Sequence, residues 1–297
     1  MPDPTTAGPL SSGTEDRLPL SVWVTGQTDP QTQLAAGPYV AETAAELHRI
    51  NPAVAAHAIA RYTRPGALVA DPDCGTGTTL VEALRAGRHA VGIAADRRSW
   101  ETARANLTAA KRTGAFTDGM VLASTAGGDV NHLVGLAGRV DLVLTAARPR
   151  LVDPGPAADL TAVLARAREL LRTDGHLVLA LPRVRRHGHL VDLADLATTA
   201  ARANGLVAVD RCVALLAELR GHRVLTHASL AHRRAAERHR RTTGHPMALH
   251  AHQDLLVFQP ALPTAATTVA TRRTNPARFT VVVPAVRRDD LAALSAA

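Results

Sequence analysis

Short apolar runs alternate with amphipathic stretches from about residue 50 to residue 258 of this chain. Runs without regularly spaced polar positions are typical of strands that are buried on both faces. Seven predicted strands lie at Leu68–Ala70, Ala90–Asp96, Leu122–Thr125, Arg139–Thr145, His176–Pro182, Leu206–Leu216 and His250–Phe258. Apolar residues at helical spacing predict helices over Asn51–Tyr62, Thr79–Ala86, Trp100–Lys111, Ala157–Arg172 and Asp192–Asn204. Alternation of this kind predicts an α/β fold, doubly wound around a mostly parallel sheet.

The turn after the first predicted strand carries the most specific signal in the chain. It reads Asp-Pro-Asp-Cys-Gly-Thr-Gly-Thr-Thr from Asp71 to Thr79. Gly75 and Gly77 allow the backbone to bend sharply or to lie against a ligand, because no Cβ is in the way. Asp71 lies at the carboxyl end of the strand, where open α/β sheets bind their ligands. The turn lacks the lysine and spacing of phosphate-binding loops, so it predicts a ligand site of another kind.

This turn, followed by Leu-Val-Glu-Ala, resembles the first motif of class I methyltransferases that use S-adenosylmethionine. It is most similar to the DNA amino-methyltransferases, which act on N4 of cytosine or N6 of adenine, and the resemblance covers about residues 50–258. The resemblance implies the Rossmann-like class I methyltransferase fold, with a mostly parallel sheet of seven strands. It also implies S-adenosylmethionine as a cofactor, with loop positions at Asp71, Cys74, Gly75, Gly77 and Thr78.

Two positions that hold the cofactor in the family depart from its pattern. The acidic residue that accepts hydrogen bonds from the ribose is replaced by Ala94, and Asp96 follows two residues later. Asp96 could take this role only if the loop is remodelled, and we favour the alternative that it caps the next helix. The aspartate that receives the adenine amino group is replaced in the segment Ala123-Ser124-Thr125. A charged acceptor contributes about 1.5–3 kcal/mol against about 0.5–1.5 for a neutral one, so we predict a weakened cofactor site.

The segment that should carry the acceptor motif is also altered. Family members continue the fourth strand with Asp, Ser or Asn, then Pro-Pro and an aromatic residue, which hold and stack the flipped target base. This chain reads Thr145-Ala146-Ala147-Arg148-Pro149 there. The polar acceptor, the double proline and the aromatic are missing, so no catalytic residue can be carried over.

Two functions therefore compete. The first is an S-adenosylmethionine-dependent DNA methyltransferase whose activity is impaired by loss of the acceptor motif. The alternative is a non-catalytic protein that keeps the fold and binds nucleic acid or a partner protein.

Charge favours a nucleic-acid partner, and the family's substrates favour DNA. The net charge is +8 and the isoelectric point is about 10.9. Aromatic residues make up only 2% of the chain, which argues against binding of single strands by base stacking. The segment Arg220–Arg241 is dense in arginine. It predicts either a phosphate-contacting surface or an ordinary solvated helix.

The remaining sequence features limit the class of protein and its domain boundaries, but they indicate no chemistry. Cys74 and Cys212 predict neither a disulfide framework nor a zinc site, and no metal site is predicted. No apolar run is long enough to span a membrane, so we expect a cytoplasmic protein. We expect a disordered leader over residues 1–17, a methyltransferase-like domain over 18–262 and a partly disordered extension over 263–297. Trp23 is expected to anchor the first arm on the domain.

Overall fold

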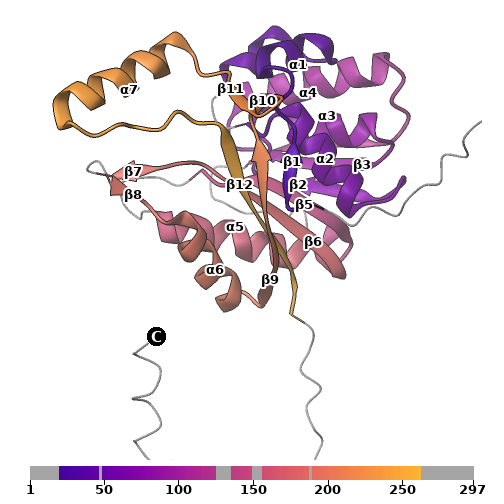
Figure 1. The fold of residues 1–297 in the computed structure, drawn as a ribbon. Coiled ribbons are helices and arrows are strands. Elements are labelled where there is room, and N and C mark those ends of the chain that lie inside the picture. The colour runs from indigo at the N-terminus through magenta and orange to yellow at the C-terminus, as the bar shows by residue number, and fades with distance from the viewer. Residues whose placement is uncertain (1–19, 47–48, 125–134, 149–155, 187–188, 262–297) are drawn as a thin grey trace, which may run out of the picture. The chain divides into compact units, whose positions relative to one another are not determined.

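An eight-stranded sheet forms the centre of the structure (Figure 1). This computed structural model describes residues 20–46, 49–124, 135–148, 156–186 and 189–261. All of these lie within a unit that spans Met1–Leu262. The expected leader, 1–17, and the expected extension, 263–297, lie outside the described residues, so the predicted domain boundaries stay predictions.

The sheet has the strand order β1-β9-β12-β6-β5-β2-β3-β4. Only β12 runs antiparallel to its neighbours, β6 and β9, and the other pairings are parallel. This confirms the predicted doubly wound, mostly parallel sheet. The strands are β1 (Val22–Val24), β2 (Leu68–Asp71), β3 (His89–Ala94), β4 (Gly119–Ala123), β5 (Val140–Ala146), β6 (Leu171–Leu181), β9 (Leu206–Leu215) and β12 (His252–Pro260).

The eighth strand, β1, corrects the predicted number of seven. Its residues pair in parallel with the far end of β9, where Trp23 lies opposite Ala214. The Trp23 side chain is 1% exposed, and its ring lies 4.6 Å from that of His57. The expectation that Trp23 anchors this arm is therefore confirmed, and the arm extends the sheet as a strand.

Helices cover both faces of the sheet, as a buried parallel sheet requires. One apolar cluster joins the sheet to α2, α3 and α4, and the other joins it to α5 and α6. Val69 belongs to the first cluster and its neighbour Ala70 to the second, since successive strand residues point to opposite faces. The helices are α1 (Pro30–Ala36), α2 (Pro52–Tyr62), α3 (Thr78–Arg85), α4 (Arg97–Arg112), α5 (Pro156–Leu170) and α6 (Leu193–Ala203), with a short 3-10 helix, η1 (Ala41–Ala45).

The predicted helix Ala157–Arg172 ends earlier than its apolar spacing suggests. α5 ends at Leu170 and β6 begins at Leu171, which pairs with Val140. Arg172 reaches Asp141 of β5 at 2.8 Å and Asp174 at 2.9 Å. Strand pairing with β5 therefore prevails over helical spacing in this segment.

The arginine-dense segment begins as a hairpin and continues as a helix that extends away from the sheet (Figure 1). β10 (Ala217–Arg220) and β11 (Arg223–Thr226) form the hairpin, and α7 (Leu230–Thr243) follows. A second small pair, β7 (Arg185–Arg186) and β8 (His189–Leu190), follows β6. No residue of α7 is buried. Of the helices described, none is long and apolar enough to cross a membrane.

Candidate functional site

The glycine loop between β2 and α3 has the backbone that its sequence predicts. Gly75 and Gly77 have φ angles of 50° and 82°, the left-handed region that favours glycine. The Cys74 amide donates to the Ile93 carbonyl of β3 at 2.8 Å. Asn106 of α4 donates to the Thr76 carbonyl at 2.8 Å, and its side chain is fully buried. Neighbouring elements thus hold the loop on both sides.

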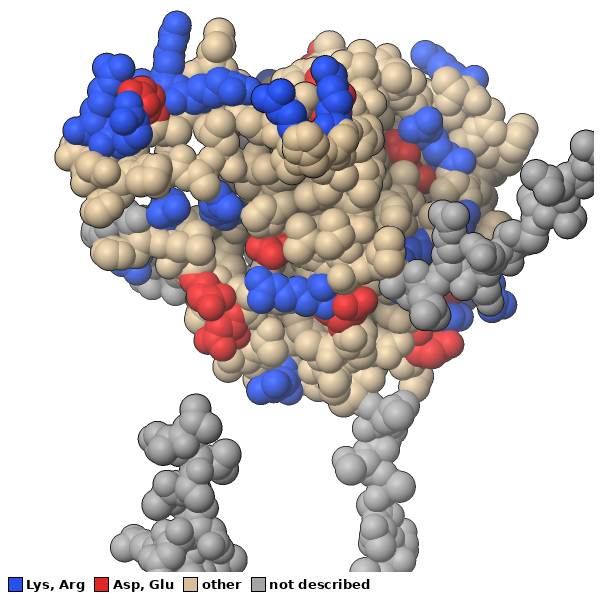
Figure 2. Space-filling model, viewed as in Figure 1, with Lys and Arg blue, Asp and Glu red and all other residues tan. Residues whose placement is uncertain are grey.

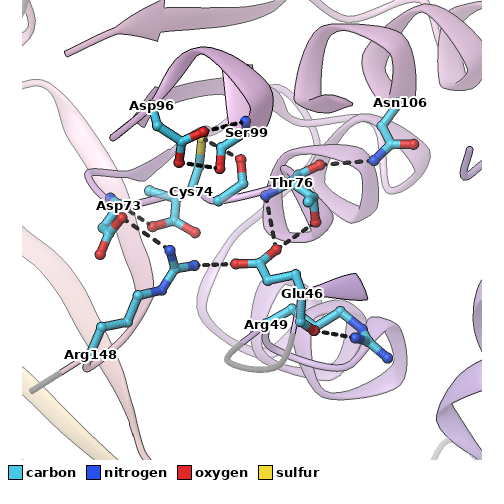
Figure 3. A network of polar contacts seen from close by, with 11 residues as sticks. Glu46, Arg49, Asp73, Cys74, Thr76, Asp96, Ser99, Asn106 and Arg148 are labelled. Carbon is cyan, nitrogen blue, oxygen red and sulfur yellow. Dashed lines mark hydrogen bonds and ion pairs between the residues drawn. The ribbon is translucent and has the colours of Figure 1, made fainter. Parts of the chain in front are cut away.

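A carboxylate of the chain itself lies on this loop (Figure 3). Glu46, just after η1, accepts a hydrogen bond from the Thr76 amide at 2.8 Å and another from the Thr76 hydroxyl at 2.5 Å. A Cβ added to Gly75 would lie only 1.9 Å from Glu46 Oε1. The space that Gly75 leaves open is therefore filled by Glu46.

Arg148 joins this carboxylate to the loop from the other side. Its guanidinium lies 2.5 Å from Glu46 and 3.2 Å from Asp73 (Figure 3). The side chains of Glu46, Arg148 and Asp73 are 13%, 25% and 26% exposed. Burial opposes the charge of Arg148, but Asp73 and Glu46 outweigh it and raise the pKa of the guanidinium. We call these three residues the loop cluster.

The loop cluster brings together two of the predicted regions and one residue that the sequence did not indicate. Asp71, Cys74, Gly75, Gly77 and Thr78 lie on or beside one loop, and Arg148 comes from the altered acceptor segment after β5. Pro149 lies outside the described residues. Glu46 was not predicted, because it is 102 residues from Arg148 and no local pattern marks it. The cofactor roles of the loop positions stay predictions.

Asp96 lies at the next strand end and caps a helix. Its carboxylate accepts from the Ser99 amide at 2.9 Å and the Ser99 hydroxyl at 2.7 Å. These hydrogen bonds lower the pKa of Asp96, and they match the favoured capping alternative. Ala94 is fully buried at the end of β3, and the Ser124 amide donates to its carbonyl at 2.9 Å.

Two groups at the base of the loop are deeply buried. Burial raises the pKa of Asp71 to about 7, although the Thr145 hydroxyl and Arg148 act in the opposite direction. Asp71 Oδ1 also accepts from the Asp73 amide at 3.2 Å. Burial raises the pKa of the Cys74 thiol well above its usual range, so this thiol is not set up as a nucleophile. Cys212 is likewise buried, as expected for a packed thiol.

Comparison with known proteins gives one family and a common fold. Residues 14–104 match the model of a family of N6 and N4 methyltransferases described as DNA methylase. Over these residues, which include the glycine loop, the resemblance seen in the sequence is confirmed. The mostly parallel sheet with helices on both faces is the Rossmann-like architecture that this resemblance implies. Enzymes of that family use S-adenosylmethionine as the cofactor.

Among the solved structures that are similar to this chain are methyltransferases of several kinds. TrmN from Thermus thermophilus is 18% identical over 71% of this chain and 49% of its own length, with a TM-score of 0.46. This chain thus spans about half of that structure. A precorrin-6y C5,15-methyltransferase from Geobacter metallireducens is 11% identical over 73% of this chain and 91% of that one, with a TM-score of 0.47. Likenesses at this level say nothing about the substrate. No curated protein matches the sequence.

Proposed function

We propose that this protein is a degenerate DNA amino-methyltransferase that binds DNA and does not transfer methyl groups to it. The observation that carries this proposal is the position of Arg148. It comes from the segment where the family has its acceptor motif, and it is paired with Glu46 and Asp73.

A guanidinium is unsuited to the chemistry of that segment. The acceptor motif must accept hydrogen bonds from a target amino group, whereas arginine has five donors and no acceptor. Arg148 therefore cannot take the acceptor role that methyl transfer to an amino group requires.

The residues around the loop also do not fit the cofactor as the family holds it. Glu46 covers Gly75, Asp96 is engaged as a helix cap, and Ala94 has no group that could accept from a ribose. These contacts support a site weakened for S-adenosylmethionine.

The basic helix α7 supports nucleic-acid binding. It carries five arginines and one glutamate, Glu237, and basic side chains follow it across the molecular surface (Figure 2). Arg240 and Arg241 share Glu237. Neither Arg234 nor Arg238 pairs with a carboxylate in the described part of the chain. These two are exposed and four residues apart, so they lie on one side of the helix and can contact phosphates.

A hollow of about 300 Å³ lies beside α7. It is lined by Arg183, Arg185, His232 and His250 and by the apolar residues Ala235, Met247, Ala248 and Leu249. Backbone phosphates supply most nucleic-acid contacts, and the two arginines of this hollow add positive charge beside the basic helix.

We also propose that the protein acts in the cytoplasm, as the sequence analysis predicts.

The test of this function combines three measurements on the full chain. Transfer of a labelled methyl group from S-adenosylmethionine to duplex DNA is expected to be undetectable. Calorimetric titration with S-adenosylmethionine is expected to show little or no binding. Binding of the same duplex is expected to be detectable and to weaken with salt. Methyl transfer to DNA would refute the proposal and would favour the active enzyme.

The double variant Arg234→Ala/Arg238→Ala tests the role of α7. Each arginine that no longer neutralises a phosphate is expected to lower the slope of log K against log salt by about 0.9, so the double variant lowers it by about 1.8. The matched control is Arg112→Ala/Arg202→Ala, which removes two exposed arginines from α4 and from the last turn of α6. An equal decrease in the control would mean that binding follows net charge and not α7.

A further inference from the structure

We propose that the glycine loop and Arg148 form a carboxylate-binding site, and that Glu46 is its internal occupant, in competition with a ligand that carries a free carboxylate. This inference rests on the proposed function, since it explains how a preserved loop fails to bind the cofactor.

The site consists of donors that converge on one carboxylate. The Thr76 amide and hydroxyl both reach Glu46 Oε2, and the Arg148 guanidinium reaches Glu46 Oε1. Hydrogen bonds between ionised partners are about twice as strong as neutral ones. The Thr76 side chain is buried, at 7% exposure for the residue. Three convergent donors in a half-buried position are what a carboxylate group of any source requires.

Donor capacity also remains at the site. Arg148 Nε is buried and has no hydrogen-bond partner among the described residues. Buried donors without partners are costly. Glu46 and Asp73 therefore leave the site incompletely satisfied.

Glu46 directly follows the 3-10 helix η1, which has few buried residues. Only Thr43 of η1 is buried, and the other four residues are exposed. The Thr43 hydroxyl accepts a hydrogen bond from the Asn106 side chain at 2.8 Å. Glu46 can be removed by mutation without taking any large side chain out of the core. The Thr43 contact is expected to hold η1 in place when the Glu46 carboxylate is absent.

Competition by an internal group lowers the apparent affinity by the fraction of molecules in which the site is free. If that fraction is about a tenth or less, removal of the Glu46 carboxylate increases affinity by about tenfold or more. The ligand class is an adenosyl amino acid with a free α-carboxylate, because the loop belongs to a fold that binds such a molecule. The α-carboxylate is the group that replaces Glu46.

The experiment is calorimetric titration with S-adenosylhomocysteine, which carries this carboxylate and no methyl group to transfer. It compares the unaltered chain with Glu46→Ala and with Glu46→Gln. Glu42→Gln is the matched control, because Glu42 is an exposed carboxylate of the same 3-10 helix. Circular dichroism and thermal melting establish that each variant is folded.

We expect Glu46→Ala to bind at least tenfold more tightly than the unaltered chain, with Glu42→Gln unchanged. Adding Arg148→Met to Glu46→Ala is expected to remove the gain. Equal affinities for the unaltered chain and folded Glu46→Ala would overturn the inference, and so would the absence of binding to all variants. Neither result affects the proposed function, which fails instead if the unaltered chain methylates DNA.

Discussion

This protein has two clusters of arginine and carboxylate side chains, one largely buried and the other exposed to solvent. The loop cluster joins Arg148 to Glu46 and Asp73 across 102 and 75 residues of sequence. On α7, Glu237 pairs with Arg240 and Arg241, three and four residues away. We call this second group the helix cluster. Its side chains are 40%, 58% and 75% exposed, against 13–26% for the loop cluster.

The difference in surroundings changes what the same ion pair does. Exposed pairs between neighbouring helix residues contribute little to stability, because water and salt screen them. Hydrogen bonds from Arg240 and Arg241 lower the pKa of Glu237 to about 2, yet this shift does not translate into stability at an exposed site. In the loop cluster, removal of one partner leaves a charge with little water around it. The loop cluster therefore shapes a site, whereas the helix cluster only moderates the charge of a surface.

Asp71→Asn is expected to have the largest effect. In the folded state the pKa of Asp71 is about 7, against an ordinary value of 3.8. The folded protein therefore holds a proton that the unfolded chain releases, and its stability falls as pH rises from about 4 to about 7. At about 1.4 kcal/mol per pKa unit, this loss amounts to up to about 4 kcal/mol. Asn cannot ionise, and it keeps an oxygen that can accept from the Asp73 amide.

Urea unfolding between pH 4 and pH 8 checks this prediction. The variant should gain stability over the unaltered chain as pH rises, and the gain should be complete just above pH 7. If the free energies of unfolding of the two proteins changed with pH in parallel, the prediction would be wrong. Asp71 would then be ionised in the folded protein throughout this range.

Arg148→Met is expected to have the next largest effect. It removes the cation and leaves Glu46 and Asp73 near each other in a half-buried position. Loss of one partner from a fully buried pair costs about 3–5 kcal/mol, and the partial exposure here reduces this to about 2–3 kcal/mol. Urea unfolding at pH 8 measures the change in the free energy of unfolding.

Arg97→Met is the matched control for this change. Arg97 pairs with Glu101 at 2.8 Å on α4, and the two side chains are 89% and 55% exposed. The control is expected to unfold like the unaltered chain. Equal effects of Arg97→Met and Arg148→Met would remove the distinction between buried and exposed pairs on which the comparison depends.

The sequence predicted the parts of this structure whose signals are local. Apolar runs indicated seven strands of the large sheet, namely β2, β3, β4, β5, β6, β9 and β12, and the glycines indicated the turn at which φ is positive. Asp96 precedes a predicted helix by a few residues, and it is the N-cap of α4, as the sequence favours. Each of these features depends on residues within a few positions of one another.

The parts that could not be predicted depend on distant partners. β1 has three residues, and it is a strand only because β9 lies beside it, with Val22 opposite Val213. Glu46 looks like an ordinary surface charge in the sequence. Arg148 stands in the altered acceptor segment, but only the fold places the two together on Gly75. The start of β6 at Leu171 likewise depends on β5. Sequence reasoning therefore identified the loop but not what fills it.

Glu237→Gln is expected to have the smallest effect on stability and a visible effect on binding. The substitution removes the only carboxylate of α7 and frees Arg240 and Arg241 from it. Because both pairs are exposed, the urea midpoint should not change. The slope of log K against log salt for duplex DNA should become steeper by up to about 0.9 if one more phosphate is contacted. A fall in the urea midpoint comparable to that of Arg148→Met would contradict the comparison. It would mean that the helix cluster holds α7 in place, so that the basic surface is part of the fold and not an addition to it.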